Sequence, residues 1–492
     1  MIGLSTAAEV RAAEVRAAED VLLARTREGA LMRRAATGLA TVCLRRLGRA
    51  HGVRVTVLVG GGNNGGDALF AGAHLAARGA RVTAVLLDPG RAHPAGLAAL
   101  RRAGGRVTGP EGPDGLDRAD LVLDGIVGIG GRGGLRPAAA ALAERAATGP
   151  GLTVAVDVPS GVDADTGAVE GAAFPVLHTV TFGAVKPGLV VGDGRGYAGT
   201  VHLVDIGLGP HLAPPRAHQL TDADVAAHLQ PPEPGDDKYS RGVVGVVAGS
   251  ATYPGAAVLC TGAALRTRAG LVRYAGTAGD GVRAAWPEAI VTDGRPADAG
   301  RVQAWVAGPG MGTDDDARSV LAEVLATDLP VVVDADALTM AAREPALVRG
   351  RDAPTVLTPH DREFERFGVP VDADRVGSAR RLAAELGAVV LLKGDATVVA
   401  APDGTAYVNA TGTSELATAG TGDVLAGILG ALLATGTPAA ETAAAAAHLH
   451  GRTGQLAAER GPLIAGDLVR RLPETVGRVR EPGTGGLRDS EA

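Results

Sequence analysis

The chain has 492 residues, of which 46% are hydrophobic and 21% are charged, and its formal net charge is −6. Single hydrophobic cores rarely grow beyond about 250–300 residues, so the length predicts two large domains. The acidic balance argues against nucleic acid and anionic membranes as partners, and the two cysteines exclude a disulfide framework and a cysteine-based metal site.

The N-terminal half alternates between short apolar runs and Ala-rich stretches of helical length. Residues 5–50 are predicted to be helical, and their acidic side chains argue against a signal peptide. Strands are predicted at 53–59, 81–87, 121–123, 153–156, 178–182 and 201–204. Continuous apolar runs are typical of buried parallel strands, so we expect an α/β fold. No run reaches the roughly 20 apolar residues of a membrane span, and we expect a cytoplasmic protein.

A Pro-rich segment predicts a linker at 213–236, with a short helix at 222–229. The alternation resumes after it, with strands predicted at 243–248, 304–306, 330–333, 355–357, 388–392, 397–400 and 406–408. The last helices are predicted at 421–435 and 439–456. The domains are therefore expected at 1–212 and 237–474, and a tail at 475–492 is expected to be disordered, because from about Glu481 it has little to bury.

A Gly-rich loop, Val59-Gly-Gly-Gly-Asn-Asn-Gly-Gly-Asp67, joins a predicted strand to a predicted helix at 68–78. Its glycines let backbone amides approach a phosphate, and a helix N-terminus favours an anion. Asn63 and Asn64 interrupt the spacing of the dinucleotide fingerprint, and they suit the capture of a sugar, an amide or a cation. The alternative is a tight turn in which Asp67 caps the helix.

Further polar side chains follow other predicted strands of the same half. Asp124 ends one apolar run, Asp157 and Ser160 follow the next, and Lys186 follows a third. Because the carboxyl ends of parallel strands converge on one crevice, these side chains and Asn64 are expected to face a single pocket. Each acid taken alone is also explained as a cap or a turn residue.

Four motifs carry a resemblance over roughly residues 5–210: GGGNNGGD, DGIVG, AVDVPSGVDADTG and TFGAVKPGL. Together they resemble the NAD(P)H-hydrate epimerase family, which implies a Rossmann-like three-layer αβα sandwich. The substrate implied is NADH or NADPH hydrated at C6 of the nicotinamide ring (NADHX or NADPHX), and the reaction interconverts its R and S forms. The substrate-binding residues implied are Asn63, Asn64, Gly65, Gly66, Asp67, Gly128, Ile129, Gly130, Gly131, Arg132, Gly133, Gly134 and Asp157.

The residue types suit that reaction. Inversion at C6 requires proton transfer, for which Asp157 is the candidate acid/base and Lys186 a possible electrostatic partner. The resemblance also implies a potassium ion held by oxygens of Asn64, Asp124 and Ser160. Ala68 departs from the family pattern, in which glycine is usual, and residues 128–134 are richer in glycine than usual.

The C-terminal half contains a second turn of this kind, Gly420-Thr-Gly-Asp423, before a long Ala/Leu helix. Such a turn aims backbone amides at an anion and places a carboxylate beside a group that is being phosphorylated. The alternative is a glycine turn in which Asp423 is only a favourable charge at the helix N-terminus.

The turn, the segment Lys393–Thr397 and the loop Asn409–Thr413 together resemble a ribokinase-like α/β fold. Four more segments narrow this to the ADP-dependent NAD(P)H-hydrate dehydratase family over roughly residues 220–474: 238–242 with 249–250, 308–312, 334–338 and 358–363. The resemblance implies that the S form loses water while ADP becomes AMP and phosphate, with Mg²⁺ bridging phosphate oxygens and Asp423 as the base. The cofactor-binding residues implied are Ala263, Gly312, His360 and Asp423, and those for ADP are Lys393, Gly394, Asp395, Ala396, Thr397 and Gly422.

Two other interpretations stay open at this point. A ribokinase-type small-molecule kinase fused to a sugar- or nucleotide-binding domain would share Asp423 and its turn, and the N-terminal domain could be a binding module without turnover. Glu415 replaces a residue of the family pattern close to the expected phosphate site, where an acid is unfavourable unless it points into solvent. We expect small-molecule partners (NADHX, NADPHX and ADP) and a homo-oligomer.

Overall fold

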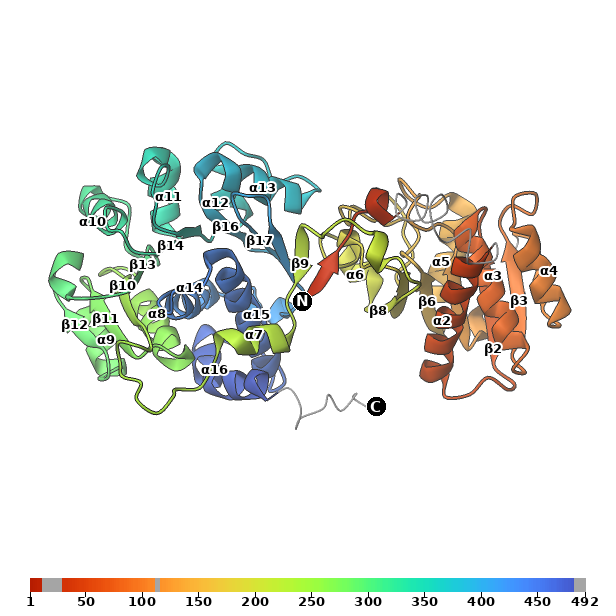
Figure 1. Ribbon diagram of the computed structural model, residues 1–492, viewed down its shortest axis with the longest axis horizontal. Coiled ribbons are helices and arrows are strands. Elements are labelled where there is room, and N and C mark those ends of the chain that lie inside the picture. Colours follow the sequence, from red (N-terminus) through yellow and green to blue (C-terminus); the bar gives the residue numbers. More distant parts are fainter. Residues whose placement is uncertain (11–28, 111–115, 482–492) are drawn as a thin grey trace. The chain divides into compact units, whose positions relative to one another are not determined.

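The computed structural model describes residues 1–10, 29–110 and 116–481. The chain divides into two compact units, one of residues 3–216 and one of residues 217–492 together with Met1 and Ile2 (Figure 1). Among the described residues, no helix is long and apolar enough to cross a membrane.

The described part of the N-terminal unit forms a seven-stranded sheet in the order β4-β3-β2-β5-β6-β7-β8, and every pair is parallel. The strands are β2 (Arg54–Val59), β3 (Arg81–Leu86), β4 (Arg106–Thr108), β5 (Leu121–Gly125), β6 (Leu152–Val156), β7 (His178–Phe182) and β8 (Thr200–Val204). The chain runs outward from β2 to β4 and then returns to place β5 on the other side of β2. The strand order therefore reverses direction between the neighbours β2 and β5. Sheets of this kind bind ligands at such a switch point, beyond the carboxyl ends of the strands.

Helices cover both faces of this sheet (Figure 1). They are α2 (Ala30–Leu47), α3 (Asn63–Ala76), α4 (Pro94–Arg102), α5 (Pro137–Ala147) and α6 (Gly194–Ala198). Successive β2 residues point to opposite faces: Val57 joins the core beneath α2 and α3, and Leu58 joins the core beneath α5. The Rossmann-like three-layer sandwich is thereby confirmed.

The described part of the C-terminal unit contains an eleven-stranded sheet in the order β1-β9-β18-β17-β16-β15-β14-β13-β10-β11-β12. The run from β12 to β16 is parallel, and β17 is antiparallel to both of its neighbours. The strands are β1 (Ile2–Leu4), β9 (Ala217–Gln219), β10 (Val243–Val247), β11 (Leu271–Ala275), β12 (Ile290–Thr292), β13 (Ala304–Ala307), β14 (Val331–Val333), β15 (Thr355–Leu357), β16 (Val389–Leu392), β17 (Thr397–Ala400) and β18 (Ala406–Asn409).

One face of this sheet is covered by α8 (Pro254–Thr267), α14 (Thr421–Leu433), α15 (Ala439–Ala458) and α16 (Ala465–Arg480). Val306 and Val332 point into the core that these helices share. On α14 every residue from Val424 to Leu433 is buried, which is the pattern of a helix inside a large core. The other helices are α7 (Asp222–His228), α9 (Gly279–Ala285), α10 (Asp315–Leu325), α11 (Asp336–Arg343), α12 (Asp361–Glu365) and α13 (Arg375–Leu386); α10 to α13 lie across the sheet from α14 and α15 (Figure 1).

Several sequence-based boundaries need correction. The segment expected to be a linker contains the predicted short helix as α7 and also β9, and Val225 and Leu229 are fully buried in the C-terminal core. Residues 475–480 of the expected tail are helical, because α16 continues to Arg480 and buries Val476 and Val479. Residues 11–28 of the predicted N-terminal helices and residues 482–492 lie outside the described residues. Strands β1, β4, β9, β11 and β12 and helix α16 were not predicted.

Candidate active sites

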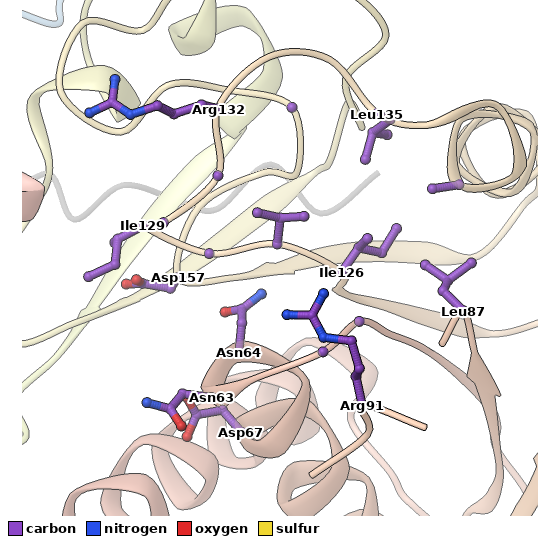
Figure 2. A pocket seen from close by; sticks show the side chains of 18 of the residues that line it. Asn63, Asn64, Asp67, Leu87, Arg91, Ile126, Ile129, Arg132, Leu135 and Asp157 are labelled. Atoms are coloured by element: carbon purple, nitrogen blue, oxygen red, sulfur yellow. The ribbon is translucent and has the colours of Figure 1, made fainter. Parts of the chain in front are cut away.

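A cavity of about 830 Å³ opens beside the carboxyl ends of β2, β5 and β6. The residues predicted there that line it are Asn63, Asn64, Asp67, Gly128, Ile129, Gly130, Gly131, Arg132, Gly133, Gly134, Asp157 and Lys186. Figure 2 shows Asn64 between Asp157 on one side and Arg91 on the other. Thus the structure brings together most of the N-terminal residues that the sequence selected.

Four residues expected at this pocket do not line it: Asp124 and Ser160 are buried behind its wall, and Gly65 and Gly66 are buried in the first turn of α3. A Cβ at Gly65 would lie 2.3 Å from the carbonyl oxygen of Gly60, and one at Gly66 would lie 3.0 Å from His93. The two glycines therefore allow α3 to pack closely and do not line the cavity. The helix also begins at Asn63, five residues earlier than predicted.

Asp157 and Lys186 form an ion pair at the cavity wall, with Lys186 Nζ 2.5 Å from Asp157 Oδ1. Lys186 has no exposed surface and Asp157 is 8% exposed. The ammonium also donates to Thr181 Oγ1 at 2.9 Å and to the Phe182 carbonyl at 3.0 Å, so each of its three protons has an acceptor. Asp157 Oδ1 further accepts from Thr181 Oγ1 and from the Phe182 amide.

The backbone of Asp157 has φ 69°, which is left-handed for a residue other than glycine. Asp and Asn adopt this conformation at lower cost than other side chains, and such strain is concentrated at functional sites. It turns the chain sharply after β6, while the carboxylate is held by β7 and by the segment that follows it.

Asp124, at the end of β5, has no exposed surface. Its carboxylate accepts the Ser160 hydroxyl at 2.6 Å and the Ser160 amide at 2.8 Å, and the Ser160 hydroxyl also contacts the backbone of Val127. Burial raises the pKa of Asp124 to about 6, although the hydrogen bonds from Ser160 and Ile126 act in the opposite direction. Among the described residues no cationic side chain is paired with it. This buried carboxyl group therefore has hydrogen-bond donors around it but no cationic partner among the described residues.

The Asn64 side chain packs against Gly128, where an added Cβ would lie 2.8 Å from Asn64 Oδ1. Its Nδ2 is buried and has no hydrogen-bond partner in the described parts of the chain. Gly62, just before α3, has φ 98°, so only glycine fits this turn without strain. Asn64 thus contacts the loop 125–128, which follows Asp124 and whose Val127 backbone is hydrogen-bonded to the Ser160 hydroxyl.

In the C-terminal unit, Lys393 follows β16 and reaches Asp334, which follows β14. Lys393 Nζ lies 2.9 Å from Asp334 Oδ1, an oxygen that also accepts the Thr358 hydroxyl at 2.7 Å. Glu363 Oε2 lies 3.7 Å from the same ammonium. The pKa of Lys393 is raised, because Asp334 and Glu363 together outweigh the opposing effect of burial. A permanently charged lysine is therefore fixed at this edge of the sheet.

Asp423 lies in the first turn of α14, just after Gly420, whose φ is 87°. Its pKa is raised to about 7, first by burial and then by the negative charges of Asp334 and Asp336, against the attraction of Lys393. A Cβ at Gly422 would lie 3.7 Å from Lys393 Nζ, so the glycine turn lies next to the lysine ammonium. A carboxyl group with a pKa near 7 is well suited to accept and return a proton at neutral pH.

The remaining predicted C-terminal residues have mixed placements. The Gly312 amide donates to Asp336 at 2.9 Å; Gly394, Asp395 and Ala396 lie in the turn between β16 and β17, and Thr397 is the first residue of β17. His360 caps α12 through Glu363 and leaves half of its side chain exposed. Ala263 does not join the group: it has no exposed surface and packs against Gly427 of α14, where helix contact explains its small size. Glu415 is exposed.

Sequence reasoning did not assign roles to Asp334 or Gly308 in this unit, nor to Arg91 in the other. A Cβ at Gly308 would lie 1.8 Å from the carbonyl oxygen of Asp334, so the glycine is required for the close approach of these two loops. The sequence motifs at 308–312 and 334–338 contain both residues, but the motifs alone did not predict that the two segments touch. Arg91 carries no such signal and was found only from the cavity.

The fold and the two sites define the class: a two-unit α/β enzyme that joins a Rossmann-like unit with a buried Asp–Lys pair to a second α/β unit with an acid at a glycine turn. A family model described as YjeF-related protein N-terminus matches residues 28–188, and one described as NAD(P)H-hydrate dehydratase matches residues 244–476.

The chain is 52% identical over 475 residues to a bifunctional NAD(P)H-hydrate repair enzyme of Mycobacterium leprae (strain TN), with 95% of this chain and 97% of that protein covered. It is 55% identical over 438 residues to the enzyme of the same name from Mycobacterium tuberculosis (strain CDC 1551 / Oshkosh), with 87% and 90% covered. A crystal structure of a ribokinase-like superfamily protein from Enterococcus faecalis V583 matches with a TM-score of 0.51 and 26% identity, over 55% of this chain and 99% of that one. The chain belongs to the family of bifunctional NAD(P)H-hydrate repair enzymes, and the ribokinase-like expectation is confirmed.

Proposed function

We propose that the chain repairs hydrated nicotinamide cofactors in two steps, in line with its family. The N-terminal unit interconverts the R and S forms of NADHX and NADPHX, and the C-terminal unit dehydrates the S form with ADP as co-substrate. The observation that carries the proposal is that each unit places one carboxylate, Asp157 or Asp423, beside a glycine-containing turn at a candidate site on an α/β sheet.

In the N-terminal cavity, Asp157 is the group that moves the proton. Inversion at C6 requires the hydroxyl group to leave and return, or the ring to open, and both routes need a proton at oxygen or nitrogen. Lys186 positions the carboxylate through Oδ1 and leaves Oδ2 for the substrate, since the hydrogen bonds that Asp157 accepts from other described side chains and amides all end on Oδ1. Gly128 to Gly134 and the start of α3 hold the rest of the molecule.

The residues around Asp124 fit a potassium ion. A fully buried carboxylate without a cationic partner in the described chain, a serine hydroxyl 2.6 Å from it and a nearby amide form a set of oxygen donors of the kind that a monovalent cation takes. Asn64, Asp124 and Ser160 would hold the ion. When bound, it would neutralise Asp124 and fix the loop that carries Gly128.

In the C-terminal unit, Asp423 accepts the proton of the C6 hydroxyl as that oxygen attacks the terminal phosphorus of ADP, and AMP leaves. The phosphate then departs from C6, and a ring proton is lost as the double bond re-forms. The amides of Gly420 to Gly422 and the ammonium of Lys393 face the transferred phosphoryl group and stabilise its charge. Residues 394–396 of the turn, Thr397 at the start of β17 and Gly422 hold the nucleotide, and Gly312 and His360 hold the hydrated cofactor.

Magnesium would reach this site with the nucleotide. The described residues contain no cluster of three or more His, Cys, Asp or Glu that could hold a metal ion. Mg²⁺ is commonly held by one or two carboxylates and by substrate phosphates, which fits the excess of acids around Asp336 and Asp423. Its chemistry would be to offset charge on the phosphate oxygens.

The deciding experiment mixes the purified protein with an R/S mixture of NADHX and follows the return of reduced-nicotinamide absorbance with ADP, with ATP and without nucleotide. Recovery with ADP that exceeds the S fraction supports both activities, because the R form must be converted before it is dehydrated. Recovery that stops at the S fraction refutes the epimerase, and a flat signal with nucleotide consumed against another alcohol supports the kinase alternative.

Two further expectations belong to the same proposal. The substrates are soluble nucleotides of the cell interior, so we place the protein in the cytoplasm, with small molecules and not nucleic acid or membranes as partners. We also propose a homo-oligomer, which light scattering of the purified full chain tests directly.

A further inference from the structure

The strand order of the N-terminal unit predicts how a dinucleotide lies in its cavity. With β2 as the first strand, the order β4-β3-β2-β5-β6-β7 is 3-2-1-4-5-6, the order of dinucleotide-binding sheets. In such sheets the pyrophosphate lies at the first helix N-terminus, and the two nucleotide halves extend over opposite sides of the switch point. Asp157 follows β6, so the nicotinamide half lies over β5 to β7, and the adenosine half lies over β3.

The turn after β3 supplies two charged side chains to the cavity at the adenosine end. Asp88 and Arg91 both line it, and the Arg91 amide donates to the Asp88 carbonyl at 3.1 Å, which closes the turn. In dinucleotide-binding sheets, the residues after this strand contact the 2′ position of the adenosine ribose: an acid accepts its hydroxyl, or an arginine accommodates a 2′-phosphate.

Arg91 is placed to act on a phosphate. A Cβ at Gly61 would lie 3.0 Å from Arg91 Cβ and 3.4 Å from its Nε, so the side chain lies along the glycine loop. Figure 2 shows its guanidinium pointing into the cavity toward Asn64, across from Asp157. It forms no ion pair with any carboxylate in the described residues, and its surface is exposed. A guanidinium without a protein partner is free to bind a phosphate bidentately.

We infer that Arg91 binds the 2′-phosphate of NADPHX and makes the N-terminal unit favour NADPHX over NADHX, while Asp88 accepts a ribose hydroxyl. This inference rests on the proposed epimerase function. No residue of the family motifs is involved, because the turn 88–91 lies between the glycine loop and the Asp124 segment.

The test measures epimerisation of (R)-NADPHX and (R)-NADHX separately by the full chain without ADP, so that the dehydratase is silent, with chromatographic separation of the epimers. For Arg91→Ala we expect KM for NADPHX to rise about 10–100-fold, the value of a charged hydrogen bond, with KM for NADHX changed less than about 2-fold. Arg91→Lys should retain much of the preference, because the charge stays. Asp88→Ala should raise KM for NADHX more than for NADPHX.

Arg102 provides the matched control, because it is an exposed arginine of α4 outside the cavity. Arg102→Ala removes the same charge from the same unit and should change neither KM. Equal losses on both substrates in Arg91→Ala would overturn the inference and place Arg91 on the pyrophosphate. No loss on either substrate would overturn it as well and place the adenosine elsewhere. If the unaltered chain does not convert the R form at all, the proposed epimerase itself fails, which is a different result.

Discussion

Lys186 directs its ammonium onto Asp157 Oδ1 from a position with no exposed surface. Removing the lysine would leave a buried carboxylate unpaired, so we predict that Lys186→Met destabilises the N-terminal unit by about 3–5 kcal/mol. Adding Asp157→Asn should restore part of that loss, because the two residues act as one pair.

The measurement uses the distribution of tryptophans. Trp286 and Trp305 both lie in the C-terminal unit, so their fluorescence follows that unit alone, whereas circular dichroism follows both. Lys186→Met should shift a urea transition seen by circular dichroism and leave the fluorescence transition in place. A shift in fluorescence, or additive losses in the double variant, would contradict the assignment.

Asp423→Asn should abolish dehydration and leave epimerisation intact. The amide cannot accept the hydroxyl proton, and loss of a general base costs about 10²–10⁴-fold in rate. Recovery of absorbance from pure S form with ADP measures the first activity, and epimer separation without ADP measures the second. Asp157→Asn, which keeps the left-handed backbone, provides the reciprocal test: dehydration of pure S form continues while R-form conversion is lost. If both variants lose both activities, the two sites are not independent.

Asp423→Asn should also stabilise the C-terminal unit in alkaline solution. The raised pKa means that folded Asp423 keeps its proton between about pH 4 and 7, where the unfolded chain has lost it. Its contribution to stability therefore falls as pH rises through this window. Asp423→Asn has no such loss, and at pH 8 it should be more stable than the native chain by on the order of 1–3 kcal/mol, with little difference near pH 4. Tryptophan fluorescence in urea at both pH values checks the sign.

Dehydration should depend on pH through Asp423. Its pKa of about 7 means that the carboxylate form, which acts as base, is lost as the solution becomes more acidic. We expect kcat/KM for the S form to rise about tenfold per pH unit below 7 and to level off above it. Epimerisation in the same samples serves as the internal control for general loss of structure. A profile that is flat between about pH 5.5 and 8.5 would remove Asp423 from the role of base.

Potassium should stabilise the N-terminal unit. Burial holds the pKa of Asp124 at about 6, so above that pH the folded chain carries an uncompensated buried charge that a bound cation offsets. We expect the midpoint of thermal unfolding, followed by circular dichroism, to be higher in potassium chloride than in choline chloride of equal ionic strength. The difference should be larger at pH 8 than at pH 5 and absent in Asp124→Asn. Equal midpoints in both salts at pH 8 would exclude the ion from this site.

The site residues that could be predicted from the sequence are those that lie at the end of a strongly apolar strand. Asp124 and Asp157 were located in this way, since continuous Val/Leu runs are unambiguous. Contacts between distant loops were not predictable. Lys393 and Asp334 are 59 positions apart, and neither segment contains a sequence feature that indicates contact with the other. Strand β11 was missed because Arg273 interrupts its apolar run, and α16 because Pro473 lies inside the helix.

The left-handed backbone of Asp157 restricts what chemistry can be explored at that position. A library that randomises residue 157 should return folded proteins mainly with Asn, Asp or Gly, since other side chains meet their own backbone there. Asn keeps the shape and removes the charge, so it separates proton transfer from architecture, whereas Ala alters both. The backbone conformation of this one residue thus limits which catalytic side chains can replace Asp157 without a change in the surrounding backbone.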